Sequence, residues 1–342
     1  MAKNYSDMEY IILILSLAGI VLGADFLVNG AVVVAKKCRV SSFVIGAVIV
    51  GIGTSLPELV VSTVGAIGGN SEVAIGNVVG SNIFNVFAIL GLTALFSPVA
   101  VSRENMKFEI PFCIGVSVLL MLLVYNFFVG GEPLLGRLDG AVLLVFFAAF
   151  MAISLRRGKA GSRAETSDTM ENAEPEVRST DDKIIKKENW RQSMWFAVLS
   201  ILGGLAALIV SSNFFVDEAV AIAKKLGVSD AFISITLLAC GTSLPELAAS
   251  ITAALKKDTD MALGNIIGSN IFNATMILGT ASLITPLNTG KIGLVDYAAM
   301  ILAAVLPLLF GFRGKINRAE AVIMLLCYAA YTWYIVTYVM AI

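Results

Sequence analysis

Two copies of one hexapeptide carry the residues of this chain that could do chemistry. Gly53–Glu58 reads Gly-Thr-Ser-Leu-Pro-Glu, and Gly241–Glu246 repeats all six letters 188 positions later. The first copy lies inside an apolar run long enough to cross a bilayer, where a proline and a carboxylate are both costly. Because an expensive feature recurs at one offset, we interpret the two copies as functional.

Each proline is expected to open its helix. Pro57 and Pro245 offer no N–H to the carbonyl four residues before them, and their rings push that carbonyl aside. Carbonyls near Gly51–Gly53 and Ala239–Gly241 are thereby released, and in lipid such groups must face protein or a wet cavity. A cation is a suitable partner for such carbonyls, so the sequence predicts a cation site at the breaks.

A second repeated segment adds oxygen atoms on the following span. Gly80–Asn85 recurs as Gly268–Asn273 at the same offset. In both segments the polar residues lie four apart, which places them on one helix face. Hard oxygen ligands suit Ca²⁺ and Na⁺, Ca²⁺ takes about 6–8 of them, and two glutamates can balance one Ca²⁺. The candidate ligands are Thr54, Ser55, Glu58, Ser81 and Asn85, then Thr242, Ser243, Glu246, Ser269 and Asn273, with freed carbonyls beside them.

Structural roles compete with ligand binding at several of these positions. A proline kink stabilised by hydroxyl groups needs no ligand. The pairs Gly76–Gly80 and Gly264–Gly268 have the small-xxx-small spacing that is typical of close helix packing. Four further amides are expected mainly to cap helices or to bond across them: Asn77, Asn82, Asn265 and Asn270.

Composition places these segments in a membrane protein. The chain has 342 residues and is 58% hydrophobic and 14% charged, whereas soluble domains carry about 25% charged residues. Apolar runs of spanning length recur throughout, which predicts an all-α protein with ten transmembrane helices. The expected spans are 9–35, 42–68, 72–97, 109–130, 138–155, 193–223, 230–255, 259–286, 293–312 and 319–341.

Several classes of function are excluded or disfavoured by composition. The chain contains no histidine, which removes Ser-His catalysis and histidine zinc sites, and no lysine lies mid-span to support a Ser–Lys enzyme. A net charge of −1 gives no basic patch for nucleic acid. The four cysteines lack CxxC spacing and are expected to be free apolar helix residues. We expect neither enzymatic activity nor a cofactor. The first ten residues do not look like a cleavable signal peptide.

The repeat defines the domain organisation. A polar gap divides the chain into a first five-helix repeat (1–157), a linker (158–192) and a second five-helix repeat (193–342). Its composition predicts a disordered linker, with an ion-sensing or partner-binding role for its acids as a lesser alternative. An odd number of spans per half makes the second half enter the membrane from the opposite side. Inverted repeats of this kind are typical of secondary transporters, whose site lies near the midplane.

Loop charge predicts the orientation. With the linker in the cytoplasm, 19 of the 24 Lys and Arg residues fall in or beside cytoplasmic segments. Both termini are then expected to lie outside. Lys224 and Lys225 are repeat partners of Lys36 and Lys37 on the opposite side, as an inverted duplication would leave them.

The four repeated segments resemble the two alpha-repeats of the calcium/cation antiporter superfamily, most of all prokaryotic sodium/calcium exchangers. The resemblance implies an antiporter that exchanges Ca²⁺ for Na⁺ by alternating access, with the long first and sixth spans as a sliding gate. It implies a central Ca²⁺ site from Glu58, Glu246 and the carbonyls of Thr54 and Thr242. Flanking Na⁺ sites would use Ser55 and Ser81 with Glu58, Ser243 and Ser269 with Glu246, and the carbonyls of Gly51 and Ala239.

One position departs from the family pattern. Many sodium/calcium exchangers carry Asp where this chain has Asn273, so both repeats here end in Asn and the centre has two carboxylates. The coupling ion and stoichiometry therefore stay open. The close alternative is a proton-coupled exchanger of Ca²⁺ or another divalent cation. A cation channel is a more distant one, because such filters are usually built from several subunits.

Overall fold

The computed structural model describes residues 2–126, 132–171, 193–226 and 239–340, and these are almost entirely helical. In chain order the elements of the first half are α1 (Ala2–Cys38), α2 (Ser42–Ile45), η1 (Gly46–Gly51), α3 (Ile52–Thr54), α4 (Leu56–Ile67), α5 (Ser71–Phe84), η2 (Asn85–Leu90), α6 (Gly91–Phe96), β1 (Val99–Ala100), η3 (Asn105–Glu109), α7 (Ile110–Tyr125), β2 (Leu134–Leu135) and α8 (Arg137–Glu171). Those of the second half are α9 (Met194–Lys225), α11 (Ala239–Gly241), α12 (Leu244–Leu255), α13 (Thr259–Phe272), η6 (Asn273–Ile277), α14 (Leu278–Ile284), β3 (Leu287–Asn288), α15 (Leu294–Gly311), β4 (Lys315–Ile316) and α16 (Arg318–Met340). The η segments are π-helical turns.

The spans follow the sequence prediction closely. Eight described helices are long and apolar enough to cross a membrane, and the helix pair Ser42–Thr54 and Leu56–Ile67, bent by 46°, makes a ninth. The predicted span 230–255 is described only in its second part, as α11 and α12, because residues 227–238 lie outside the described residues. Helix α8 continues to Glu171, so the first part of the predicted linker is helical. Residues 172–192 are not described.

Two short strand ladders show that the repeats are inverted. β1 pairs antiparallel with β4, and β2 pairs antiparallel with β3. The η3–α7 span separates β1 from β2, so the two ladders lie at opposite ends of the helices. β1 and β3 occupy equivalent positions in the two repeats, 188 residues apart, yet they lie at opposite ends. The chain is therefore an all-α membrane protein with two inverted repeats.

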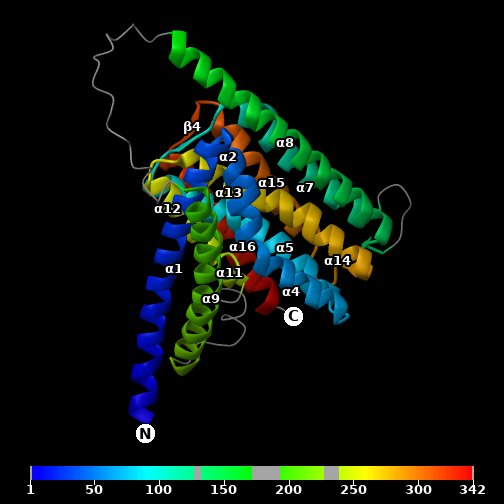
Figure 1. The fold of residues 1–342 in the computed structure, drawn as a ribbon. Coiled ribbons are helices and arrows are strands. Elements are labelled where there is room, and N and C mark those ends of the chain that lie inside the picture. Colours follow the sequence, from blue (N-terminus) through cyan, green and yellow to red (C-terminus); the bar gives the residue numbers. More distant parts are fainter. Residues whose placement is uncertain (1, 127–131, 172–192, 227–238, 341–342) are drawn as a thin grey trace.

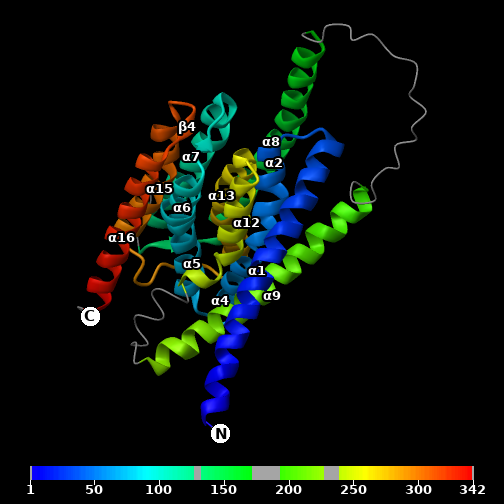
Figure 2. The same ribbon diagram turned by 90° about the vertical axis from the view of Figure 1, so that its left-hand side faces the viewer.

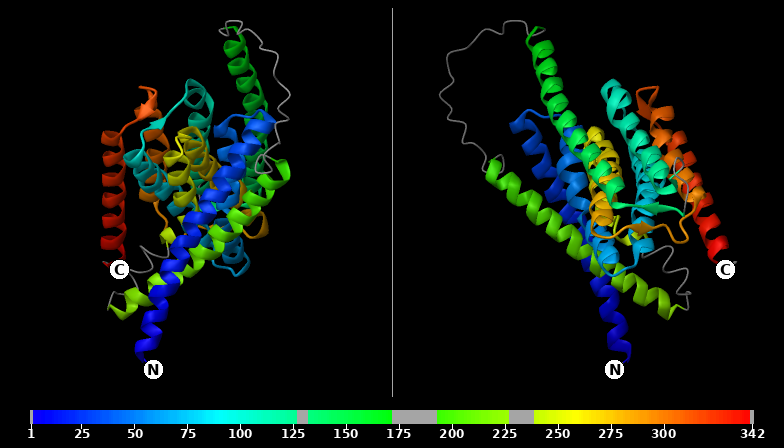
Figure 3. Two further views of the ribbon diagram at one scale, coloured as in Figure 1. Left: turned by 60° about the vertical axis from the view of Figure 1, so that its left-hand side comes forward. Right: turned by 90° about the vertical axis from the view of Figure 1, so that its right-hand side faces the viewer.

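The repeats meet along α5 and α13, which lie in the middle of the molecule (Figures 1 and 2). α1 and α9 pack side by side and cross on one flank, while α15 and α16 lie on the other flank (Figure 3). The ends of α1 and α16 that carry the chain termini point toward the same end of the molecule (Figure 1). The broken helices therefore enter the centre from opposite ends, between the two flanks.

Gly264 and Gly268 of α13 lie in close contact with the backbone of the first broken helix. A Cβ on Gly264 would clash with the carbonyl oxygen of Phe43, and one on Gly268 would lie 2.7 Å from the carbonyl oxygen of Ala47. The packing interpretation is therefore confirmed for Gly264–Gly268. In the first pair, a Cβ on Gly76 would meet only the side chain of Ile292, at 3.4 Å, and one on Gly80 would meet no described atom within 4 Å beyond its own helix, so the close-packing interpretation is wrong for Gly76–Gly80.

Candidate cation site

Both helices break at the serine of the hexapeptide. Ser55 has φ −82° and ψ 9°, and Ser243 has φ −93° and ψ 9°. α4 and α12 begin at the next residue, with the proline in the first turn, where a missing N–H is tolerated. Each glutamate also lies in this first turn, where the helix dipole favours negative charge. The predicted break therefore forms in both repeats.

The two glutamates are fully buried and are bonded across the repeats. Glu58 and Glu246 are each 0% exposed. Ser243 Oγ donates to Glu58 Oε1 at 2.9 Å, and Ser55 Oγ donates to Glu246 Oε1 at 2.8 Å. The resemblance grouped each serine with the glutamate of its own half, but the hydrogen bonds join it to the other half. The two hexapeptides therefore form one site.

Four amides tie α5 to α13 through symmetric hydrogen bonds. Asn82 Nδ2 donates to the carbonyl of Asn270 at 3.1 Å, and Asn270 Nδ2 donates to the carbonyl of Asn82 at 3.1 Å. Asn85 Nδ2 donates to Asn270 Oδ1 at 3.0 Å, and Asn273 Nδ2 donates to Asn82 Oδ1 at 3.2 Å. The expectation that Asn82 and Asn270 bond across helices is confirmed. These bonds also aim the amide groups of Asn85 and Asn273.

A second pair of amides supports the backbone of the glutamates. Asn77 Nδ2 donates to Ser62 Oγ at 3.0 Å, and Asn265 Nδ2 donates to Ser250 Oγ at 2.8 Å. Each amide also donates to the carbonyl of the glutamate in its own repeat, at 3.3 and 3.2 Å. The sequence analysis did not single out Ser62 and Ser250. Their spacing of 188 residues was the signal that would have found them.

Six buried oxygen atoms of the candidate ligands have no hydrogen-bond partner among the described residues. In a dry interior, each unsatisfied polar atom costs about 1–3 kcal/mol. Two belong to carboxylates, two to amide carbonyls and two to hydroxyl groups, so all six can coordinate a hard cation. They are Oε2 of Glu58 and Glu246, Oδ1 of Asn85 and Asn273, Oγ of Ser81 and Oγ1 of Thr242.

The remaining candidate ligands already have partners. Thr54 Oγ1 donates to the carbonyl of Val50 at 3.0 Å, and Ser269 Oγ donates to the carbonyl of Gly51 at 3.2 Å. The Gly51 carbonyl also accepts the backbone N–H four residues later, at 3.0 Å. The expectation that the proline frees this carbonyl is therefore wrong, because the hydrogen-bond ladder continues to the break. Ala239 begins α11, but its side chain is not described.

Within the described ranges, no group of three or more His, Cys, Asp or Glu side chains could hold a metal ion, and all four cysteines are free thiols. The site consists of two carboxylates surrounded by neutral oxygens. Such a donor set suits Na⁺ and Ca²⁺ and disfavours softer metals.

A groove runs along α5 from one end of the helices to Ser81, one of the candidate ligands. It has a volume of about 420 Å³ and follows α5 from Asn70 and Glu72, at the α4–α5 turn, to Gly80 and Ser81. The turn lies at the end that carries the β2–β3 ladder, since α5 runs from it toward β1. The groove therefore ends beside Ser81, on the face of α5 where Gly80 leaves space, while Glu58 and Glu246 are fully buried.

Comparison with known proteins agrees with this architecture. The family profile described as "Sodium/calcium exchanger protein" matches residues 8–156 and 196–337. The chain is 35% identical over 349 residues to the sodium/calcium exchanger MaX1 of Methanosarcina acetivorans, which covers 95% of this chain and 97% of the relative. It is 30% identical over 328 residues to the inner membrane protein YrbG of Escherichia coli, covering 96% of each.

A solved structure of the sodium-calcium exchanger NCX_Mj has a TM-score of 0.76 and 31% identity, and the match covers 94% of this chain and 97% of that one. Inverted repeats around a buried, oxygen-lined site define a secondary transporter of cations. The chain belongs to the sodium/calcium exchanger family, whose members are multi-pass membrane antiporters of Ca²⁺ and other cations.

Proposed function

We propose that this chain exchanges Ca²⁺ for Na⁺ by alternating access, with Glu58 and Glu246 at the central cation site. The observation that carries the proposal is the set of six buried oxygens without partners, two of them on these carboxylates. A bound cation would satisfy them. Two relatives reported above are named sodium/calcium exchangers, which favours this pair of ions.

The proposed ligand assignment follows the resemblance. Ca²⁺ binds between Glu58 and Glu246, with the carbonyls of Thr54 and Thr242. Na⁺ binds on either side, at the hydroxyl groups of the serines and, in the second repeat, at a carbonyl of the broken helix. These further ligands are Ser55, Ser81, Ser243, Ser269 and the carbonyl of Ala239, with Asn85 and Asn273 beside them, whereas the carbonyl of Gly51 keeps its hydrogen bonds.

Exchange follows from the charge of the site. Ca²⁺ and Na⁺ compete for the same two carboxylates, so the site holds one kind of cargo at a time. An empty site would keep two buried negative charges close together, which is costly away from water. A change of access is therefore penalised unless a cation is bound, and transport of one ion requires return of the other.

A proton-coupled exchanger is the second candidate. Both repeats end in Asn, so the central charge is carried by Glu58 and Glu246 alone, and two protons could neutralise them as well as Na⁺ could. A channel is disfavoured because the symmetric site is built inside one chain and its carboxylates are buried on both sides.

We also propose the orientation predicted from loop charge, the membrane implied by the resemblance and the division predicted from the repeat. The protein lies in the plasma (inner) membrane of a prokaryote, with both termini outside and the linker (158–192) in the cytoplasm, between repeats at 1–157 and 193–342. The β1–β4 end, which carries Arg103, Lys107, Arg313 and Lys315, is then cytoplasmic, and the groove along α5 opens to the outside.

Uptake of ⁴⁵Ca²⁺ into vesicles tests the proposal. Vesicles loaded with Na⁺, or carrying only a pH gradient, separate the two coupling ions, and uptake that ignores both gradients would contradict exchange. Glu58→Gln and Glu246→Gln are each expected to abolish gradient-driven uptake, whereas Glu104→Gln, at an exposed carboxylate directly before η3, is the matched control. Native uptake by either buried variant would refute the site assignment.

A further inference from the structure

α1 and α9 form one rigid unit. A Cβ on Gly204 would lie 2.6 Å from the backbone nitrogen of Leu27 and 2.7 Å from the carbonyl of Gly23, so the two backbones touch where the helices cross. At the other end of the pair, Lys225 Nζ lies 2.6 Å from Glu9 Oε2. Any movement of one helix against the central helices therefore carries the other with it.

This unit packs on the central helices asymmetrically. Ala24 and Ala31 of α1 share a buried cluster with Ala249 and Ala253 of α12, and none of the four is more than 1% exposed. The repeat equivalent of Ala249 is Val61 on α4, which is 37% exposed and borders the groove. The α1–α9 unit therefore covers the path beside α12 and leaves the path beside α4 open.

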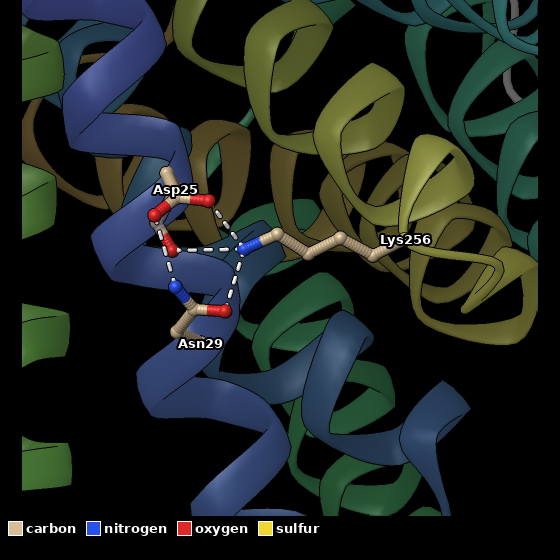
Figure 4. Close-up of polar contacts among 3 residues, drawn as sticks. All are labelled: Asp25, Asn29 and Lys256. Carbon is tan, nitrogen blue, oxygen red and sulfur yellow. Dashed lines mark hydrogen bonds and ion pairs between the residues drawn. The ribbon is translucent and has the colours of Figure 1, made fainter. Parts of the chain in front are cut away.

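A polar cluster fastens α1 to the end of α12 on the covered side (Figure 4). Lys256 Nζ lies 2.6 Å from Asp25 Oδ1 and donates to Asn29 Oδ1 at 2.6 Å. It also donates to the carbonyl of Asp25 at 3.3 Å, and Asn29 Nδ2 donates to Asp25 Oδ2 at 3.0 Å. Asp25 lies within the apolar span Met8–Cys38, and Lys256, directly after the end of α12, is its cationic partner.

The repeat does not provide an equivalent cluster on the other side. On α9 the repeat position of Asp25 is occupied by Asn213, and that of Asn29 is occupied by Asp217. The second repeat therefore also has one amide and one carboxylate here, but at swapped positions. The position that corresponds to Lys256 is Gly68, at the end of α4. When α9 packs on α4, no lysine is therefore available there to pair with Asp217.

We propose that Asp25, Asn29 and Lys256 form a one-sided latch that sets which side of the membrane the cation site faces at rest. The latch rests on the proposed alternating access. It holds the α1–α9 unit against α12 and so keeps closed the path at the end that bears β1 and β4. Opening the path at the β1–β4 end separates Lys256 from its three oxygen partners. Opening the path at the other end, beside α4, breaks no equivalent ion pair.

The expected effect follows from the exposure of the pair. The side chains of Lys256 and Asp25 are 29% and 49% exposed, so solvent weakens the attraction, and an ion pair of this kind shifts a two-state equilibrium by about fivefold. Lys256→Met keeps the aliphatic stem and removes the charge, while Lys256→Arg keeps the charge. Asp25→Asn removes the charge from the other partner.

In a chain whose four native cysteines, all free thiols, are replaced by alanine, labelling of an introduced cysteine by a membrane-impermeant thiol reagent measures the access state without reference to the coupling ion. Ala253→Cys reports the path beside α12, and Val61→Cys reports the path beside α4. In vesicles that present the β1–β4 end to the reagent, Lys256→Met and Asp25→Asn are each expected to raise the labelling rate of Ala253→Cys about fivefold. Lys256→Arg is expected to leave it near the native rate.

The missing latch can also be built on the opposite side. Gly68→Lys places a cation opposite Asp217 and is expected to raise the labelling of Ala253→Cys, whereas Gly68→Met, of similar length and without charge, is not. This gain does not depend on whether the other variants fold. Labelling rates that stay at native values in both Lys256→Met and Gly68→Lys would overturn the latch. Calcium uptake that ignores both gradients, with shifted labelling, would instead overturn the proposed exchange.

Discussion

Replacing Asn273 with Asp adds a third carboxyl group to the site. Asn273 is 0% exposed, its Nδ2 donates to Asn82 Oδ1 at 3.2 Å, and its Oδ1 has no partner. A carboxylate cannot donate, so in Asn273→Asp the ionised group would face another oxygen and cost about 1–3 kcal/mol. The protonated group can donate to Asn82 again. The ratio of protonated to ionised carboxyl group is therefore roughly 5- to 150-fold higher than it would be without Asn82 beside it.

The expected result is a pH dependence that the native protein does not share. At low pH the introduced carboxyl group is neutral and bonded to Asn82, so the site keeps two charges. As the pH rises, a third negative charge appears beside Glu58 and Glu246, and the apparent affinity for Ca²⁺ increases. The assay is ⁴⁵Ca²⁺ uptake under a Na⁺ gradient, with the Ca²⁺ concentration for half-maximal rate measured across a pH series in native and variant vesicles.

The equivalent residue of the other repeat provides a parallel test, and an alanine variant provides the control. Asn85 Nδ2 donates to Asn270 Oδ1 at 3.0 Å and its Oδ1 is also unpartnered, so Asn85→Asp is expected to behave in the same way. Asn273→Ala removes the amide without adding charge and is expected to add no pH dependence. If Asn273→Asp keeps the native pH profile, the carboxyl group does not depend on Asn82 and the reasoning fails.

Two further predictions test the geometry of the site and its packing. Ser55→Ala and Ser243→Ala each remove a hydroxyl group that the proposal assigns to a Na⁺ site, a contact worth about 1.5–3 kcal/mol, so equilibrium binding of Na⁺ is expected to weaken by at least roughly tenfold, about equally in the two variants. A large effect in only one would contradict the symmetric site. Gly268→Ala forces a methyl group against Ala47 and is expected to cost about 1–3 kcal/mol of stability, measured as a lowered thermal unfolding midpoint in detergent. Gly80→Ala, with open space among the described neighbours, is the control and is expected to unfold at the native temperature.

Much of the fold could be predicted from local patterns. The apolar runs predicted the spans, because in lipid the backbone must satisfy its own hydrogen bonds and only long helices do so. The break at Ser55 followed from Pro57, a covalent property of one residue. The end of α8 did not follow, because the polar composition after residue 157 suggested disorder while the helix continues to Glu171.

The sequence by itself determined which residues are candidates for the site. The 188-residue offset selected Glu58, Glu246 and the hydroxyl and amide groups around them, because proline, carboxylate and asparagine are each costly in an apolar span. It also predicted the inversion, since an odd number of spans reverses the direction of entry.

Only the tertiary structure decided which of these residues meet. Ser55 bonds to Glu246 and not to the glutamate three residues away, and the carbonyl of Gly51 keeps its partners. Asp25 and Lys256 are 231 positions apart and share no motif, so no local signal pairs them. The physical reason is that the two repeats carry the same motif but are inverted, so their packing against each other, and not their order in the chain, sets which oxygen faces which donor.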